Sequence, residues 1–121
     1  MGFSQAISTC MAKYFTFSGR AGRSEFWWFY LFTILISWGA SVVFVFTMPE
    51  DPVMASIMIN LVTLVFGFPV FAAGSRRLHD IGKSGWWQLL TLTIIGIILL
   101  IIWWATDSQK EDNQYGSYLQ E

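Results

Sequence analysis

Charged side chains are scarce in this chain of 121 residues. Asp, Glu, Lys and Arg make up 12% of it, whereas they form about a quarter of a typical soluble domain. Hydrophobic residues make up 55%, and the mean hydropathy is +0.51. A water-soluble fold of this length could not bury so much apolar surface, but lipid can cover the outward faces of spanning helices. The composition therefore predicts an all-α membrane protein with one domain over residues 1–121.

Cysteine and histidine are nearly absent, and the net charge is small. The chain has one cysteine, Cys10, and one histidine, His79. A single cysteine allows no intramolecular disulfide and no cysteine-cluster metal site, and we expect neither a metal nor a cofactor. The net charge of -1 excludes a strongly basic nucleic-acid binder, so we expect no nucleic-acid partner.

Three long runs without charged residues predict transmembrane helices. They cover residues 26–48, 53–74 and 86–105, and each is long enough, at about 1.5 Å per residue, to cross roughly 30 Å of hydrocarbon. The first run is longer than the apolar core of a signal peptide and follows mixed sequence, so we interpret it as retained. The third would also fit a re-entrant hairpin that returns to the same side, but its length favours a full crossing.

Proline and serine residues mark the ends of these spans. Pro49 to Pro52 form an acidic turn, which predicts that the first two spans form an antiparallel hairpin. Ser24 and Ser84 each precede a Trp-rich helix start, and we interpret both as N-caps at a headgroup layer. Glu25 would then lie favourably in the first turn of the first span.

The two ends of the chain are more polar than its middle. Residues 3–15 place five side chains on one helical face: Phe3, Ile7, Cys10, Met11 and Tyr14. This pattern predicts an interfacial amphipathic helix, and a loosely packed terminus is the alternative. Residues 106–121 are polar and carry one Lys against four acidic residues, and we expect a flexible or lightly packed tail.

The distribution of cations predicts the orientation. Six of the seven Lys and Arg residues precede the first span or lie between the second and third: Lys13, Arg20, Arg23, Arg76, Arg77 and Lys83. Only Lys110 follows the third span. Because positive residues accumulate on the cytoplasmic side, we predict a cytoplasmic N-terminus, an acidic turn outside and, after three crossings, a tail outside.

The segment from Arg76 to Trp87 concentrates the polar chemistry between two apolar runs. It reads Arg-Arg-Leu-His-Asp-Ile-Gly-Lys-Ser-Gly-Trp-Trp. Its charges cannot remain unpaired in hydrocarbon, so it must lie at a membrane surface. By topology it lies at the same level as the segment around Arg23, which predicts one charged layer. We expect ion pairs in that layer such as Glu25 with Arg77 and Asp80 with Arg23.

Two motifs resemble those of a bacterial inner-membrane family, the domain-of-unknown-function 805 family. They are Gly19-Arg20 through Trp28 and Arg76-Arg77-Leu78-His79-Asp80 through Trp87, and the tail's Asn113-x-Tyr115-Gly116 resembles the family's ending. The resemblance implies a small multi-spanning protein of the bacterial cytoplasmic membrane, so the predicted tail lies in the periplasm. It implies no activity. Family members often carry a proline early in the last span, and since 91–95 has none we expect a straighter third span.

The charged layer supports two hypotheses. In the first it is structural, with Glu25, His79 and Asp80 among the residues whose ion pairs lock the first span to the charged segment, which is predicted to be a loop after the second span. In the second it binds an anion, most simply the headgroup of an anionic phospholipid, because helix N-termini and cations together favour phosphate. The expected binding residues are Arg20, Arg23, Arg76, Arg77, Lys83 and Ser84. A membrane-protein partner or a second copy of the chain could use the same layer.

Catalysis and transport are weaker hypotheses. His79 as a general base would need a carboxylate to orient it, but neighbouring side chains on a helix point about 100° apart, which makes Asp80 a poor partner. No nucleophile motif accompanies His79, so we expect a non-enzymatic protein. The alternative function is a subunit of an oligomeric transporter or channel with Asn60 facing its centre, because one chain has no charged path through the membrane.

Overall fold

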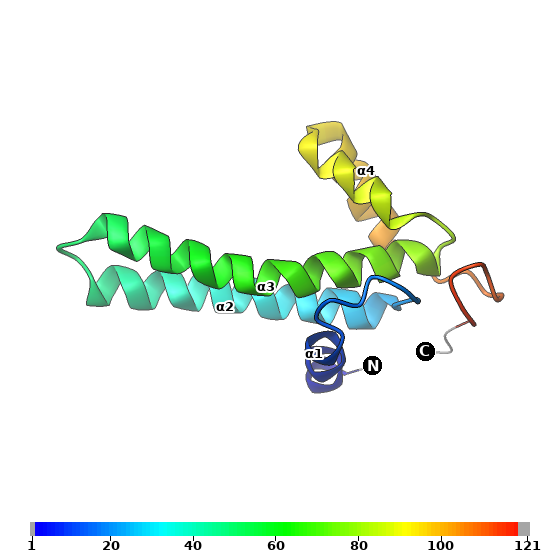
Figure 1. Ribbon diagram of the computed structural model, residues 1–121, viewed down its shortest axis with the longest axis horizontal. Helices are drawn as coiled ribbons and strands as arrows, with labels where there is room; N and C mark the ends of the chain where they lie inside the picture. Colours follow the sequence, from blue (N-terminus) through cyan, green and yellow to red (C-terminus); the bar gives the residue numbers. More distant parts are fainter. Residues whose placement is uncertain (1, 119–121) are drawn as a thin grey trace.

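The computed structural model describes residues 2–118, which form five helices and no β-strand. The helices are α1 (Phe3–Ala12), α2 (Arg23–Thr47), α3 (Pro52–Asp80), the 3₁₀ helix η1 (Gly85–Leu92) and α4 (Ile94–Ala105). In Figure 1, α2 and α3 lie side by side as one antiparallel hairpin, which we call the long hairpin. Helix α1 packs at the end of the long hairpin away from its turn. The all-α prediction is confirmed for this range.

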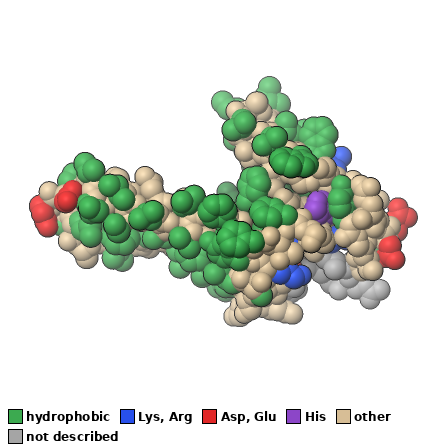
Figure 2. All heavy atoms as spheres, in the orientation of Figure 1, with side chains coloured by type: hydrophobic (Ala, Val, Ile, Leu, Met, Phe, Trp, Pro, Cys, Tyr) green, Lys and Arg blue, Asp and Glu red, His purple; other side chains and the backbone are tan. Residues whose placement is uncertain are grey.

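The hairpin predicted from the first two spans is confirmed. Helix α3 begins at Pro52, and the Asp51 side chain caps it by accepting a hydrogen bond from the backbone N–H of Met54 at 3.1 Å. Both α2 and α3 are long and apolar enough to cross a membrane. Figure 2 shows hydrophobic side chains along the long hairpin, acidic ones at its turn, and His and basic ones toward the opposite end.

Helix α2 begins one residue before the predicted cap. Its N-cap is Gly22, whose carbonyl accepts a hydrogen bond from the N–H of Phe26 at 3.2 Å. Ser24 therefore lies inside the first turn, and its assignment as the N-cap is wrong. Glu25 does lie in the first turn of α2 as predicted.

Helix α3 is longer than the predicted second span. It continues past Gly74 through the Arg-Arg-Leu-His-Asp run and ends at Asp80, so the prediction that this run is a loop is wrong. The helix ends where Gly82 adopts a φ of +80°, a conformation that glycine tolerates best. The N–H groups of Gly82 and Lys83 then bond to carbonyls of the last turn. The charged side chains are consequently held by helical geometry.

The third predicted span is not one helix. Helices η1 and α4 are separated at Thr93 and fold back on each other, so that the Trp87 and Trp103 rings lie 5.6 Å apart. We call this pair the short hairpin; in Figure 1 it leaves the end of α3 and returns to it. With 12 residues, α4 is about 18 Å long, too short to cross roughly 30 Å of hydrocarbon. The prediction of one straight helix over residues 86–105 is wrong.

A threonine and a glycine make the reversal of the short hairpin. The Thr93 hydroxyl donates to the Leu90 carbonyl at 3.1 Å and accepts from the N–H of Gly96 at 2.9 Å, so it caps α4. A side chain at Gly96 would collide with the Leu90 carbonyl oxygen. The absence of proline from this segment therefore does not straighten it, because Thr93 and Gly96 permit the break.

Helix α1 packs on the long hairpin. Its residues Ala6 and Cys10 are buried, and Cys10 joins a core cluster with Phe26, Phe29 and Ala73. A helix is present over Phe3–Ala12, three residues shorter than predicted, and its place at the membrane interface stays a prediction. Only part of its apolar face is buried. Cys10 contacts α2 and α3, whereas the side chains of Phe3 and Met11 are partly exposed.

The tail returns to the end of the long hairpin that carries the charged segment. Backbone N–H of Gln109 donates to the Asp80 carbonyl at 2.9 Å, and the Tyr115 ring stacks on His79. The sequence predicted that the tail and this segment lie on opposite sides of the membrane, but in the structure they are in contact, because the short hairpin reverses direction. The predicted tail extends to residue 121, and 119–121 lie outside the described residues.

Candidate functional site

The predicted site residues all gather at one end of the long hairpin, but at two levels. Six of them are buried and form what we call the charged layer: Arg20, Glu25, Arg76, Arg77, His79 and Asp80. Of the other three, Arg23 is exposed, and Lys83 and Ser84 are partly exposed. The structure therefore confirms that the two charged segments meet, and it separates residues that sequence reasoning had grouped together.

Asp80 is the centre of the charged layer. Its Oδ1 accepts a hydrogen bond from Arg20 Nε at 2.8 Å, and its Oδ2 accepts one from Arg77 Nη1 at 2.8 Å. The Ser108 hydroxyl donates to the same Oδ2. Both arginines and Asp80 are buried from solvent. The predicted pairing of Asp80 with Arg23 is wrong, and Arg23 instead forms an exposed ion pair with Asp107 at 3.4 Å.

A second buried ion pair joins α2 to α3. Glu25 Oε2 accepts a hydrogen bond from Arg76 Nη1, and Arg76 Nε donates to the Thr16 carbonyl at 3.1 Å. The predicted partner of Glu25 was Arg77, one residue along α3. Adjacent side chains on a helix point about 100° apart, so α3 directs Arg76 toward Glu25 and Arg77 toward Asp80. Arg76 Nη2 is buried without a hydrogen-bond partner among the described residues.

The tail closes the charged layer through its backbone. Arg20 donates to three tail carbonyls: Gln109 at 2.7 Å, Glu111 at 2.9 Å and Gly116 at 3.2 Å. These contacts use backbone oxygens, which any residue supplies, so sequence reasoning missed the tail as part of the site. Its one signal was Asn113-x-Tyr115-Gly116, which supported the family resemblance and no contact.

His79 is held by a backbone carbonyl and an aromatic ring. Its Nδ1 lies 2.9 Å from the carbonyl oxygen of Gly19, which can only accept, so Nδ1 carries the proton. Gly19 has a φ of +88°, a conformation that points its carbonyl at the imidazole without steric cost. The Tyr115 ring stacks on the imidazole with centroids 4.0 Å apart and planes 4° apart. The carboxylates of Glu25 and Asp80 face arginines, so neither orients His79 as a base.

The surface residues lie beside tryptophans. Lys83 Nζ lies 4.6 Å from the centre of the Trp103 ring, a cation–π contact. The Ser84 hydroxyl accepts a hydrogen bond from the N–H of Trp86 at 3.3 Å, which confirms Ser84 as the N-cap of η1. No three His, Cys, Asp or Glu side chains within residues 2–118 converge on a position for a metal ion.

The chain is similar to inner membrane proteins over most of its length. The profile of the family described as "Protein of unknown function (DUF805)" matches residues 14–117. The inner membrane protein YhaI of Escherichia coli K12 is 34% identical over 108 residues, which cover 88% of each chain. The inner membrane protein YhaH of the same strain is 28% identical over 107 residues, again 88% of each chain. No solved structure matches the chain.

Proposed function

The chain belongs to the DUF805 family of proteins of unknown function, and we propose that it is a non-catalytic inner-membrane protein that binds anionic phospholipid through surface cations. The buried charged layer holds the fold together, and the cations around it contact headgroups. The observation that carries the proposal is this difference between the buried arginines and the cations around them. The guanidinium groups of Arg20, Arg76 and Arg77 face internal carboxylates and carbonyls. The Arg23 side chain is 51% exposed, and Lys83 is partly exposed.

The proposed topology has two crossings, made by α2 and α3. The cations Lys13, Arg23, Lys83 and Lys110 and the charged layer belong to segments at one end of the long hairpin, and Glu50 and Asp51 form the opposite turn. The positive-inside rule assigns the basic end to the cytoplasm. Because the tail contacts the charged layer, the proposal places the tail in the cytoplasm as well.

The short hairpin enters the cytoplasmic leaflet and returns in this proposal. Its tip is apolar, with Leu92, Ile94 and Ile95 each more than four-fifths exposed. Backbone groups within a bilayer need internal partners. At the tip, the N–H of Thr93 bonds to the Leu90 carbonyl at 3.0 Å and the N–H of Ile97 to the Thr93 carbonyl at 3.0 Å. Exposed apolar side chains over a bonded backbone suit contact with lipid.

Arg23 and Lys83 are placed to contact headgroups. Lys83 Nζ contacts the Trp103 ring, and Trp27 and Trp28 follow Arg23 in the first two turns of α2. Tryptophan is enriched at the headgroup level. An interfacial Lys or Arg contributes about 1 kcal/mol to the binding of anionic lipid. The carboxylates of the charged layer are occupied by arginines, so they do not oppose this contact.

Neutralising both surface cations is expected to weaken the binding of anionic lipid. In the Arg23→Gln plus Lys83→Gln variant, the affinity for phosphatidylglycerol should fall about 30-fold, because two contacts of about 1 kcal/mol each are lost. Native mass spectrometry of the detergent-solubilised protein titrated with phosphatidylglycerol and phosphatidylethanolamine measures this. The charge-preserving Arg23→Lys plus Lys83→Arg variant should retain the affinity. Equal phosphatidylglycerol binding by wild type and the neutralised variant would refute the proposal.

A further inference from the structure

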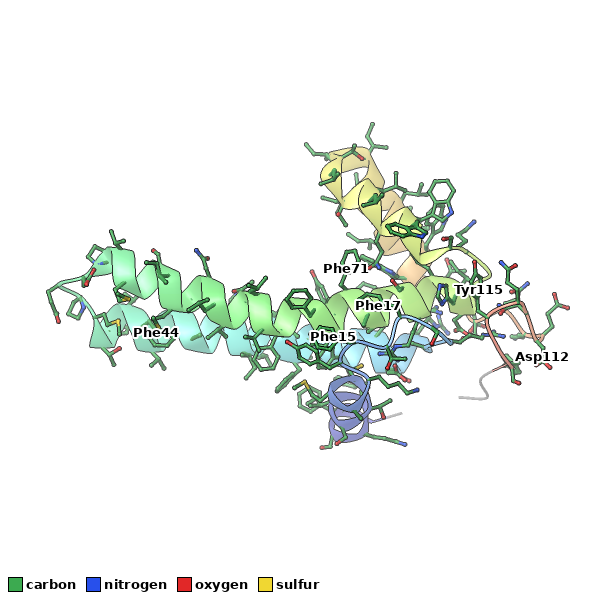
Figure 3. All side chains as sticks on the ribbon, in the orientation of Figure 1. Phe15, Phe17, Phe44, Phe71, Asp112 and Tyr115 are labelled. Carbon is green, nitrogen blue, oxygen red and sulfur yellow. The ribbon has the colours of Figure 1, made fainter. Side chains whose placement is uncertain are left out.

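A groove runs along one face of α3, from the middle of the helix to the charged layer. It consists of two hollows of about 480 and 440 Å³ that share Phe17 and Phe71 in their linings. Figure 3 shows Phe17 and Phe71 close together on this side of the molecule, with Tyr115 nearer the C-terminal end of α3. Sites for small ligands have volumes of about 300–1,000 Å³, so each hollow is large enough to hold part of one.

The lining changes from apolar to polar along the groove. The hollow nearer the middle of α3 is lined by apolar residues alone, among them Leu64, Gly67 and Phe68. The hollow at the charged layer adds hydrogen-bonding side chains, namely Ser75, His79, Ser84 and Tyr115. From Leu64 to His79 the helix rises about 22 Å, which exceeds half of a hydrocarbon core roughly 30 Å thick.

We propose that this groove binds one phospholipid molecule of the surrounding membrane. Its acyl chain lies against Leu64 to Phe71, and its headgroup reaches Ser84, His79 and Tyr115. The inference rests on the proposed membrane location of α3, because a lipid in the cytoplasmic leaflet has the same order of apolar chain and polar head as the groove. A water-soluble ligand would leave the apolar half of the groove without a matching surface.

The headgroup is recognised by hydrogen bonds and not by net charge. Arg76 and Arg77 carry the guanidinium groups nearest in sequence to Ser75 and His79 of the groove. Both are buried and bonded to Glu25, Asp80 and backbone carbonyls, and neither lines the groove. The polar lining consists of three hydroxyls and an imidazole. Because His79 Nδ1 donates to a carbonyl, Nε2 of the neutral ring is an acceptor. Such a lining suits a headgroup with donors, such as phosphatidylethanolamine.

Filling the apolar half of the groove tests the proposal. A Cβ at Gly67 meets no atom within 4 Å, so Gly67→Leu adds bulk to the groove without a backbone clash. The matched control is Gly39→Leu on α2, where a Cβ also meets no atom and which lines neither hollow. Wild type and Gly39→Leu should retain one phosphatidylethanolamine in native mass spectrometry, and Gly67→Leu should lose it. Retention by Gly67→Leu, or no retention by wild type, would overturn the inference.

A labelled lipid provides a readout that needs no variant. A phosphatidylethanolamine with a photoactivatable group in its acyl chain should crosslink wild-type protein at residues 64–71 and at Phe17. Equal labelling of the exposed face of α2 would contradict the groove. The Arg23→Gln plus Lys83→Gln variant should keep this crosslink even while its phosphatidylglycerol affinity falls, so failure of the groove and failure of the surface cation site are separate results.

Discussion

Replacing Asp80 with alanine is expected to destabilise the protein by about 3–5 kcal/mol, because a buried charge pair is costly to break from one side. Asp80 holds two buried arginines, Arg20 and Arg77. Without it, both guanidinium groups remain buried with no carboxylate, and the ion pair that joins α3 to Arg20 in the segment before α2 is lost. Unfolding by SDS titration in detergent micelles, followed by circular dichroism, measures the change in the free energy of unfolding.

The matched control for Asp80→Ala is Asp107→Ala. Asp107 also pairs with an arginine, Arg23, but the side chains are 58% and 51% exposed. Exposed ion pairs contribute about 0–1 kcal/mol, so this variant should unfold close to wild type. A loss of similar size in both variants would mean that the charged layer does not hold the fold.

Replacing Glu25 with alanine is expected to have the second large effect, a loss of about 3–5 kcal/mol together with exposure of Cys10. Arg76 is completely buried and loses its only carboxylate partner among the described residues. Cys10 lies 3.9 Å from Glu25 Oε2. Burial, followed by the charge of Glu25, raises the pKa of Cys10 to about 11, so the thiol is neutral and protected at pH 7. Maleimide labelling of Cys10 should be slow in wild type and fast in the variant.

A double variant separates exposure of Cys10 from the loss of a nearby negative charge. Glu25→Ala plus Arg76→Met also lacks the Glu25 carboxylate but leaves no unpaired buried guanidinium. Buried ion pairs replaced on both sides by apolar groups cost much less than pairs broken on one side. Cys10 should therefore stay protected in the double variant. Glu50→Ala, which removes an exposed carboxylate at the distant turn, is the charge-matched control and should label as slowly as wild type.

Hydropathy and turn chemistry were enough to predict the long hairpin. Residues 26–48 and 53–74 contain no charged residue, and the two prolines of the turn at 49–52 favour a tight reversal. The order and antiparallel direction of α2 and α3 could therefore be predicted. The end of α3 was missed because a charged run looks like a loop. Arg76 to Asp80 contain no helix breaker, and the helix continues to Asp80, two residues before the glycine at position 82.

That missed end explains the wrong ion pairs. Topology alone places Glu25, Arg76, Arg77 and Asp80 at one level, and they do meet. Which arginine faces which carboxylate depends on the rotation of α3 about its axis, and one residue changes that direction by about 100°. Arg76 therefore pairs with Glu25, and Arg77 with Asp80 three residues later on the same helix. The sequence does not give this rotation, so it could not predict which arginine pairs with which carboxylate.

Composition could not predict the reversal of the short hairpin or the position of the tail. Residues 86–105 are apolar enough for a span, and hydropathy counts length without registering a change of direction at Thr93. The reversal depends on one hydroxyl cap and on the missing side chain of Gly96. Because the reversal returns the chain to the charged layer, it also decides where the tail lies. The tail's backbone contacts to Arg20 have no signature in side-chain composition.

The side of the membrane on which the tail lies tests the account most directly. Single cysteines can be introduced by Glu50→Cys in the turn and by Ser117→Cys in the tail, while the buried Cys10 stays unreactive. With a membrane-impermeant maleimide on intact bacterial cells, the account predicts labelling of the Glu50→Cys variant alone. The Ser117→Cys variant should label only after permeabilisation. Labelling of both variants in intact cells would mean three crossings, and labelling of Ser117→Cys alone would mean the inverted orientation. Either result would contradict the two-crossing fold with its cytoplasmic charged layer.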